Sequence, residues 1–434
     1  MLVVSIMPPL SIGGAHLRKV DILSSLKSDG MTTMNDSVNE QIKVLANGTY
    51  STDIWPDSVT IIEDYSHGAN GGMDHFYAAL NGRKSLGRPV RIAFLGDSFI
   101  EGDILAGNLR EMLQSRFGGN GIGWIDAADK RNEVRPTIKA EAKGLTWHNI
   151  KEKNIDYDLC GFQMGYATLS NGCKVVLRGS KFKPHATTWQ KASVFVRNGC
   201  DITLKAKIND QPEQAFTAAP GKEMKTIDYK GNMGSLALSL SPACANSNIM
   251  YGIALESRQG VVLDNFSIRG FSGDAIAKAS KGIMQEFAKL REYDLIIMEY
   301  GLNTANDRNT DLNYRLYTNK MKNVISMLRE VYPETSILVM GVPDRSKRTL
   351  NGFETMPCIE TMTSWQRQMA SSQKVAFYSL FQTMGGRNSM KKFVDNKDAN
   401  KDYTHLTLKG GDRLARKVYR SIVTGLNNYN RRMK

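Results

Sequence analysis

Four polar blocks of this 434-residue chain carry side chains that together could act on an ester bond. Each block follows an apolar run or precedes a helical pattern. They are Gly96-Asp97-Ser98, Gly270-Phe271-Ser272-Gly273-Asp274, Tyr300-Gly301-Leu302-Asn303 and Asp402-Tyr403-Thr404-His405. Acyl transfer needs a nucleophile, a base, a group that orients the base, and hydrogen-bond donors for the oxyanion. The four blocks hold a candidate for each of these roles.

Ser98 is the candidate nucleophile and His405 the candidate base. Asp402 precedes His405 by three residues and could hold the imidazole in the useful tautomer. The candidate oxyanion donors are the backbone amides of Ser98 and Gly273 and the side-chain amide of Asn303. Gly-Asp-Ser is also common in ordinary turns, so the first block gains its meaning from the other three.

The elements around Ser98 follow from the spacing of apolar residues. Val90 to Leu95 is a short apolar run that predicts a buried strand, and from Leu105 onward apolar residues recur at helical spacing. Ser98 is therefore expected where a strand turns towards a helix, with backbone N–H groups and the positive end of the helix dipole near its hydroxyl. The nucleophile-elbow motif is not met, because Ile100 stands where that motif needs glycine.

Alternating apolar runs and helical patterns predict an α/β fold. Further strands are expected at 261–268, 295–300, 336–342 and 375–380, with helices near 275–291, 311–331, 358–372 and 409–425. Together with 90–95 these make five strands joined by helices, hence a parallel sheet covered on both faces. Right-handed crossovers place the carboxyl ends of all five strands at one edge, where ligands bind in such sheets.

A different pattern fills the middle of the chain. Short alternating runs separated by turn signals predict an inserted all-β sandwich over 130–261. We therefore divide the chain into an N-terminal extension (1–70) with one or two short helices, a discontinuous α/β domain (71–129 and 262–434) and this insert. The apolar stretch from Leu2 to Gly14 has two interpretations, the remnant of a signal or membrane anchor, or a buried strand.

Composition limits the classes of partner. A content of 41% hydrophobic and 23% charged residues is that of a folded protein with a sizeable core. The net charge of +14 suits an anionic polymer or surface, but Lys and Arg are spread along the chain without a nucleic-acid-binding signature, so no nucleic-acid partner is expected. Five cysteines without a C-x-x-C pair and six histidines without H-E-x-x-H spacing predict no metal or other cofactor. A disulfide in the central segment, which holds four of the cysteines, stays open.

A glycine-rich loop at 118–123 leads into Trp124. This tryptophan could line the cleft and stack on a sugar ring, or it could anchor the loop in the core. The sequence leaves both readings open.

The four blocks resemble those of the SGNH (GDSL-type) hydrolase family, which is named for a Ser, a Gly, an Asn and a His in this order. Ser98, Gly273, Asn303 and His405 match, and Asp402 completes the D-x-x-H block. The chain departs from the family in having Phe99 for Leu and Thr304 for Asp, and neither change removes a catalytic group. The resemblance implies a flavodoxin-like three-layer fold and ester hydrolysis through an acyl-enzyme on Ser98.

The long insert is similar in position to the carbohydrate-binding-like β domain of bacterial peptidoglycan O-acetylesterases and related O-acetyltransferases. That likeness implies an acylated glycan, with O-acetyl groups, as substrate and a periplasmic or cell-envelope location, with membrane anchoring at the N-terminus as one option. Two alternatives remain. The same residues would serve an O-acetyltransferase, and a non-catalytic glycan-binding protein would use only the insert.

Overall fold

The computed structural model describes residues 11–12, 15–16, 48–244 and 248–434. Strands β1 (Ser11–Ile12) and β2 (Ala15–His16) form a small antiparallel pair. Apart from Ser11 and Ile12, the predicted anchor remnant lies outside the described residues, and so does most of the predicted N-terminal extension. Within the described ranges, no helix has both the length and the apolar character needed to cross a bilayer.

The main sheet contains the five predicted strands and one more. Its six strands lie in the order β14-β4-β15-β16-β19-β3. Their bounds are β3 (Ile62–Asp64), β4 (Val90–Gly96), β14 (Val261–Ser267), β15 (Leu295–Glu299), β16 (Ser336–Gly341) and β19 (Ala376–Ser379). The five predicted strands are parallel, and counted along the chain they follow the order 2-1-3-4-5 of many doubly wound sheets. The short β3 pairs antiparallel at the edge beside β19 and was not predicted.

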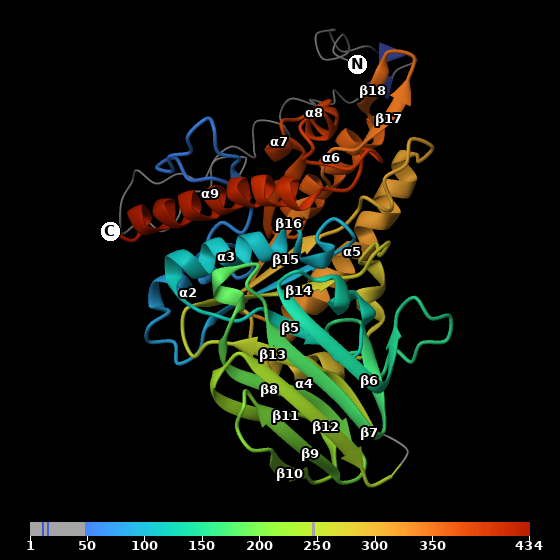
Figure 1. Cartoon of the computed structure of the whole chain (residues 1–434). Coiled ribbons are helices and arrows are strands. Elements are labelled where there is room, and N and C mark those ends of the chain that lie inside the picture. The colour runs from blue at the N-terminus through green and yellow to red at the C-terminus, as the bar shows by residue number, and fades with distance from the viewer. Residues whose placement is uncertain (1–10, 13–14, 17–47, 245–247) are drawn as a thin grey trace.

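Helices cover both faces of this sheet, as predicted (Figure 1). One face packs against α2 (Asp74–Gly82), α3 (Ala106–Phe117) and α9 (Leu408–Arg432). The short helices α7 (Leu380–Met384) and α8 (Ser389–Asp395) pack on the same face. The other face packs against α4 (Lys281–Leu290), α5 (Asp311–Val331) and α6 (Pro357–Ser372). Because both faces are covered, the strands are apolar throughout, which is why they appear in the sequence as continuous apolar runs.

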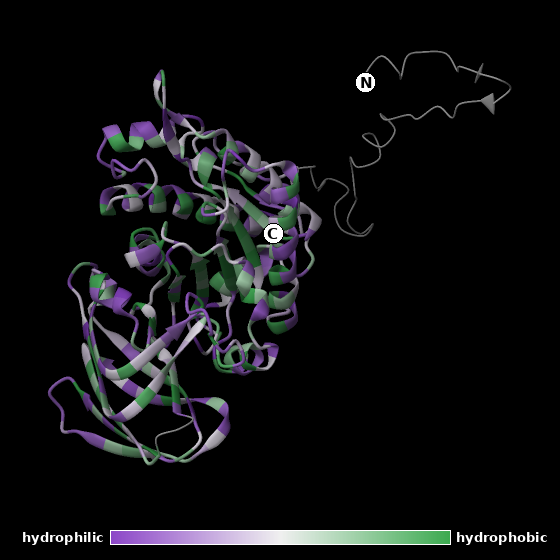
Figure 2. Cartoon of the chain, turned by 90° about the vertical axis from the view of Figure 1, so that its right-hand side faces the viewer, coloured by the Kyte–Doolittle hydropathy of each residue, from purple (hydrophilic) through white to green (hydrophobic). Residues whose placement is uncertain are grey.

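A second, antiparallel sheet of nine strands forms the lower part of the molecule in Figures 1 and 2. Its strands are β5 (Gly123–Asp126), β6 (Ile138–Asn149), β7 (Gly165–Gly179), β8 (Trp189–Asn198), β9 (Ile202–Ile208), β10 (Gln214–Ala218), β11 (Gly221–Met233), β12 (Ser235–Pro242) and β13 (Asn248–Glu256). An apolar core of its own lies between its layers. Because β5 pairs with β13, this sheet also takes in residues before 130.

The expected sandwich of two separate sheets is replaced by one continuous hydrogen-bonded sheet. The reason lies in the long strand β7, whose two halves have different neighbours. Residues 167–168 pair with β13, whereas residues 173–178 pair with β12. Its partner β6 changes register between Lys143 and Leu145. Such a shift bends a strand, so β6 and β7 pass from one layer to the other without breaking the ladder.

Buried ion pairs join the two sheets. Glu256, at the end of β13, receives hydrogen bonds from Arg91 of β4 (2.7 Å) and from Arg291 after α4 (3.0 Å). Arg291 also donates to Asp264 of β14 at 2.6 Å. Burial alone would raise the pKa of Glu256, but the two guanidinium groups outweigh it and lower this pKa to about 2. Glu256 is thus a carboxylate that ties the insert to two elements of the α/β part.

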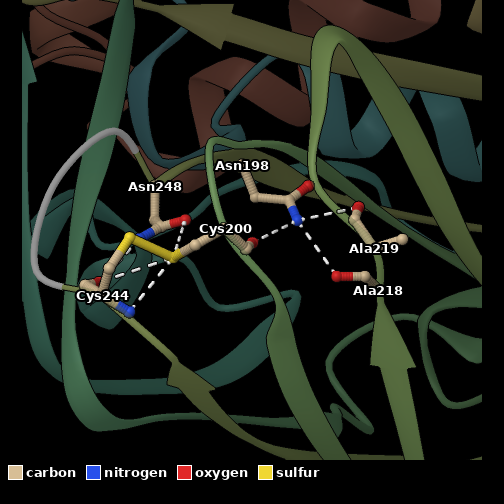
Figure 3. The surroundings of a disulfide bond; sticks show 6 residues. All are labelled: Asn198, Cys200, Ala218, Ala219, Cys244 and Asn248. Carbon is tan, nitrogen blue, oxygen red and sulfur yellow. Dashed lines mark hydrogen bonds between the residues drawn. A yellow bond between two sulfur atoms is a disulfide. The ribbon is translucent and has the colours of Figure 1, made fainter.

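A disulfide joins Cys200 to Cys244 within the antiparallel sheet (Figure 3). Cys200 precedes β9 and Cys244 follows β12, and these strands pair with each other from Ile202 opposite Pro242 onward. The bond therefore closes the end of that strand pair. The sequence alone leaves open whether any of the four central cysteines pair.

We expect Cys200→Ser with Cys244→Ser to lower the free energy of unfolding by about 2–4 kcal/mol, because the bond closes a loop between residues 44 apart in the sequence. Urea unfolding with and without reductant measures this effect. Reductant should destabilise the wild type and leave the double variant unchanged. Equal stability of the oxidised wild type and the variant would contradict the expectation.

Candidate active site

Three neighbouring parallel strands end at the same level and bring the polar blocks together. In the sheet, Gly96 of β4 lies opposite Ser267 of β14 on one side and opposite Glu299 of β15 on the other. Each strand is followed within a few residues by one of the predicted blocks. The edge expected from the α/β pattern is therefore the edge at which these blocks meet.

Ser98, His405 and Asp402 form a continuous hydrogen-bond chain. The Ser98 Oγ lies 3.0 Å from His405 Nε2, and His405 Nδ1 lies 2.8 Å from Asp402 Oδ2. A carboxylate can only accept here, so Nδ1 carries the proton and the neutral ring offers Nε2 to the Ser98 hydroxyl as an acceptor. The arrangement can remove a proton from Ser98 and hold it on a ring that faces a carboxylate.

The loop that carries Asp402 and His405 is fixed by its own hydrogen bonds. Asp402 Oδ1 accepts the backbone N–H groups of Thr404 (2.9 Å) and His405 (3.0 Å). Partial burial would raise the pKa of Asp402, but these hydrogen bonds and the one from the imidazole outweigh it, and the pKa lies below its usual range. Asp402 is 48% exposed and His405 33%, so the pair lies at the protein surface.

An aromatic stack holds the same loop from outside. Tyr403, between the two site residues, has a φ of +55°. Its ring stacks on Phe353 with centroids 3.6 Å apart and planes 6° apart. Phe353 belongs to a hairpin of β17 (Ser346–Thr349) and β18 (Gly352–Thr355) that was not predicted. The stack holds the Tyr403 side chain against this hairpin, at a residue whose backbone conformation is uncommon for any residue but glycine.

Asn303 is oriented by two acceptors. Its Nδ2 donates to Asp97 Oδ2 at 2.7 Å and to the Phe271 carbonyl at 3.2 Å. These contacts fix which end of the amide carries the donors. Asp97 Oδ1 in turn accepts the backbone N–H of Phe99 at 2.8 Å. Asp97 therefore connects the Ser98 turn to Asn303.

Gly273 needs to be glycine for two reasons. It begins the 3-10 helix η5 (Asp274–Lys278) and has a φ of +85°, a left-handed conformation. A Cβ at this position would lie 2.6 Å from the Tyr300 ring. Among the described residues, no acceptor faces the backbone N–H groups of Ser98 and Gly273. Both amides could therefore donate to a ligand.

One expectation about the surroundings of Ser98 needs correction, namely that the start of an α-helix lies beside its hydroxyl. The helix α3 starts only at Ala106, after the 3-10 turn η2 (Glu101–Asp103) in which Gly102 has a φ of +66°. The donors beside Ser98 are hence turn N–H groups and not the start of an α-helix.

The expectation that Trp124 could stack on a sugar ring is wrong, because its side chain is buried. It is 0% exposed, and its ring packs on Phe195, Phe266 and Phe287. These residues come from β8, β14 and α4. Trp124 thus anchors the junction between the two sheets, which was the other interpretation of the loop.

One buried residue near the site was missed in the sequence. Glu299 ends the otherwise apolar strand β15 and is 0% exposed. The signal was a single acidic residue at the end of an apolar run, four residues before Asn303.

We expect Gly273→Ala to destabilise the protein by about 1–3 kcal/mol more than Gly270→Ala. Both glycines have positive φ, +85° and +75°, but only Gly273 has a neighbour that a Cβ would strike. The free energies of unfolding of both variants measure the clash separately from the backbone strain. Equal losses would contradict this account of Gly273.

Comparison with known proteins bears on the fold. No family model matches the sequence, and no curated protein is similar to it. Among solved structures, a peptidoglycan O-acetylesterase matches with a TM-score of 0.69 and 22% identity over 84% of this chain and 99% of the other. A family two carbohydrate esterase from Clostridium thermocellum covers 66% of this chain and all of its own length at 12% identity, but its TM-score of 0.30 is too low to support an argument. The chain therefore shares its fold with a peptidoglycan O-acetylesterase.

Proposed function

We propose that this protein is a serine ester hydrolase of the SGNH type that removes acyl groups, O-acetyl in particular, from a polysaccharide. The observation that carries the proposal is the hydrogen-bond chain from Ser98 through His405 to Asp402, with distances of 3.0 and 2.8 Å. The strand order 2-1-3-4-5 supports the flavodoxin-like fold that the family resemblance implies.

In the proposed reaction, His405 Nε2 takes the proton of Ser98 while Oγ attacks the acyl carbon. The carbonyl oxygen becomes an oxyanion that accepts from the N–H groups of Ser98 and Gly273 and from Asn303. For this, the Asn303 amide exchanges its longer hydrogen bond, to the Phe271 carbonyl, for one to the oxyanion and keeps the one to Asp97. The ester bond then breaks, and the sugar oxygen leaves with the proton from the imidazolium, which Asp402 stabilises. Water, activated by His405, attacks the acyl-enzyme and releases the carboxylic acid.

An acetylated glycan of the cell envelope is the substrate class that we propose. The shared fold with a peptidoglycan O-acetylesterase supports it. The Cys200–Cys244 disulfide fits an oxidising compartment outside the cytosol, and the charge of +14 fits an anionic polymer. In this proposal residues 71–129 and 262–434 perform the chemistry, and the insert at 130–261 positions the glycan.

We expect Ser98→Ala and His405→Ala each to lower kcat for p-nitrophenyl acetate by at least about 1,000-fold, because both remove the attack on the acyl carbon. Ser115→Ala, at an exposed serine of α3, and His148→Ala, at a histidine of β6, are matched controls and should keep wild-type rates. A serine-reactive phosphonate should label the wild type on the peptide that contains Ser98.

Wild-type protein without turnover of acetylated glycans or of the model ester would contradict the proposal and favour a glycan-binding role. Acetyl transfer to a glycan acceptor in preference to water would turn the assignment from hydrolase to transferase. Product analysis with and without acceptor separates these two activities.

A further inference from the structure

Glu299 is a carboxyl group in an apolar setting. It is 0% exposed at the end of β15, opposite Gly96 on one side and Met340 on the other. Within the described ranges no Lys or Arg pairs with it, and neither of its oxygens has a close hydrogen-bond donor. The backbone N–H of Asp97 favours the ionised form, but burial and the Asp97 charge outweigh it. An ionised carboxylate in this position would cost several kcal/mol, so the group holds a proton.

The group that faces Glu299 is Asp97. The two carboxyl groups lie within hydrogen-bonding contact. Burial, followed by the charge of Asp97, raises the pKa of Glu299 well above its usual value, and burial raises the pKa of Asp97 to about 6. Two adjacent buried carboxylates cannot both ionise, so the pair keeps one proton. Asp97 already accepts from Phe99 and Asn303 and acts as the acceptor, which leaves Glu299 as the donor.

We propose that Glu299 is a positioning residue that, in its protonated form, donates a hydrogen bond to Asp97 and so holds the Asn303 amide in place beside the Ser98 turn. Asp97 Oδ1 holds the turn through Phe99 N, and Oδ2 holds Asn303 Nδ2. A third contact, from Glu299 in the sheet beneath, fixes the rotation of the Asp97 carboxylate that links Phe99 to Asn303. The consequence for catalysis rests on the proposed esterase function, whereas the shared proton does not.

The test compares two substitutions of similar size. Glu299→Gln keeps a neutral donor towards Asp97, and Glu299→Met keeps the length but removes the donor. We expect Glu299→Gln to retain kcat within about 5-fold and Glu299→Met to lose about 10- to 100-fold in kcat with little change in KM, because the oxyanion donor is misplaced and not removed. The melting temperature of Glu299→Met should not fall, since a buried carboxyl group gives way to an apolar side chain.

A second variant shows whether Glu299 acts through Asn303. In an Asn303→Ala background, Glu299→Met should cost less than about 3-fold in kcat, because the group that it positions is already absent. Wild-type kcat in Glu299→Met, equal losses in Glu299→Gln and Glu299→Met, or additive losses in the double variant would each overturn the positioning role.

Infrared spectroscopy tests the proton without any assay of activity. Protein labelled with 13C at the glutamate side-chain carboxyl carbon should show a protonated carboxyl C=O band at neutral pH, and Glu299→Gln should lack it. Absence of this band in the wild type would overturn the inference while leaving the esterase proposal intact. A band in a protein without esterase activity would support the shared proton and refute only the proposed function.

Discussion

Residue-by-residue hydrogen bonding between three parallel strands determines where the polar groups of the candidate site lie. Because Gly96, Ser267 and Glu299 are level in the sheet, the chain leaves all three strands at one edge. A shift of one residue would turn every side chain of a strand to the opposite face, so the apolar residues that fill both faces also fix the register. The packing of the apolar side chains therefore also sets the positions of the polar groups at the sheet edge.

Residues at the start of the insert also help to hold the turn that carries Ser98. Asp103, fully buried, accepts hydrogen bonds from Arg110 (2.6 Å), from Arg135 (3.1 Å) and from Asn265 (2.9 Å), and also from Thr137. Burial would raise the pKa of Asp103, yet the two guanidinium groups and the hydrogen bonds keep it below its usual range. Asn265 also donates to Ile100 O at 3.0 Å. Residues at the start of the insert and residues of β14 thus hold the same turn that presents Ser98.

The elements that could be predicted are those with a signal in their own sequence. The helix expected at 311–331 is α5 with the same bounds, because Thr310 and Asn313 form a capping box and its apolar stripe is regular. The five parallel strands are continuous apolar runs. The long strand β6 gave no such signal, since most of its side chains are exposed or half-buried and its partners decide its course. The burial of Trp124 likewise depends on Phe195 and Phe287, which follow it by 71 and 163 residues.

The candidate site was predictable for a different reason, namely that its residue types follow a known order, although Ser98 and His405 are 307 residues apart. The order of these residues could not reveal Glu299, which lies buried beneath the Ser98 turn. Glutamate at a strand end is ordinarily solvated, but here Gly96 lets the Ser98 turn fold close over the sheet. A Cβ at Gly96 would lie 2.7 Å from Ile100 and 3.1 Å from the Glu299 carbonyl.

The Glu299 side chain below this turn is fully buried, and the burial of an acid costs stability. A core chosen for stability alone would place an apolar side chain there. Departures from that rule are expected where function needs a group held in one orientation. The carboxyl beneath the turn is such a departure, and it lies one hydrogen bond away from Asp97, the residue that joins Ser98 to Asn303.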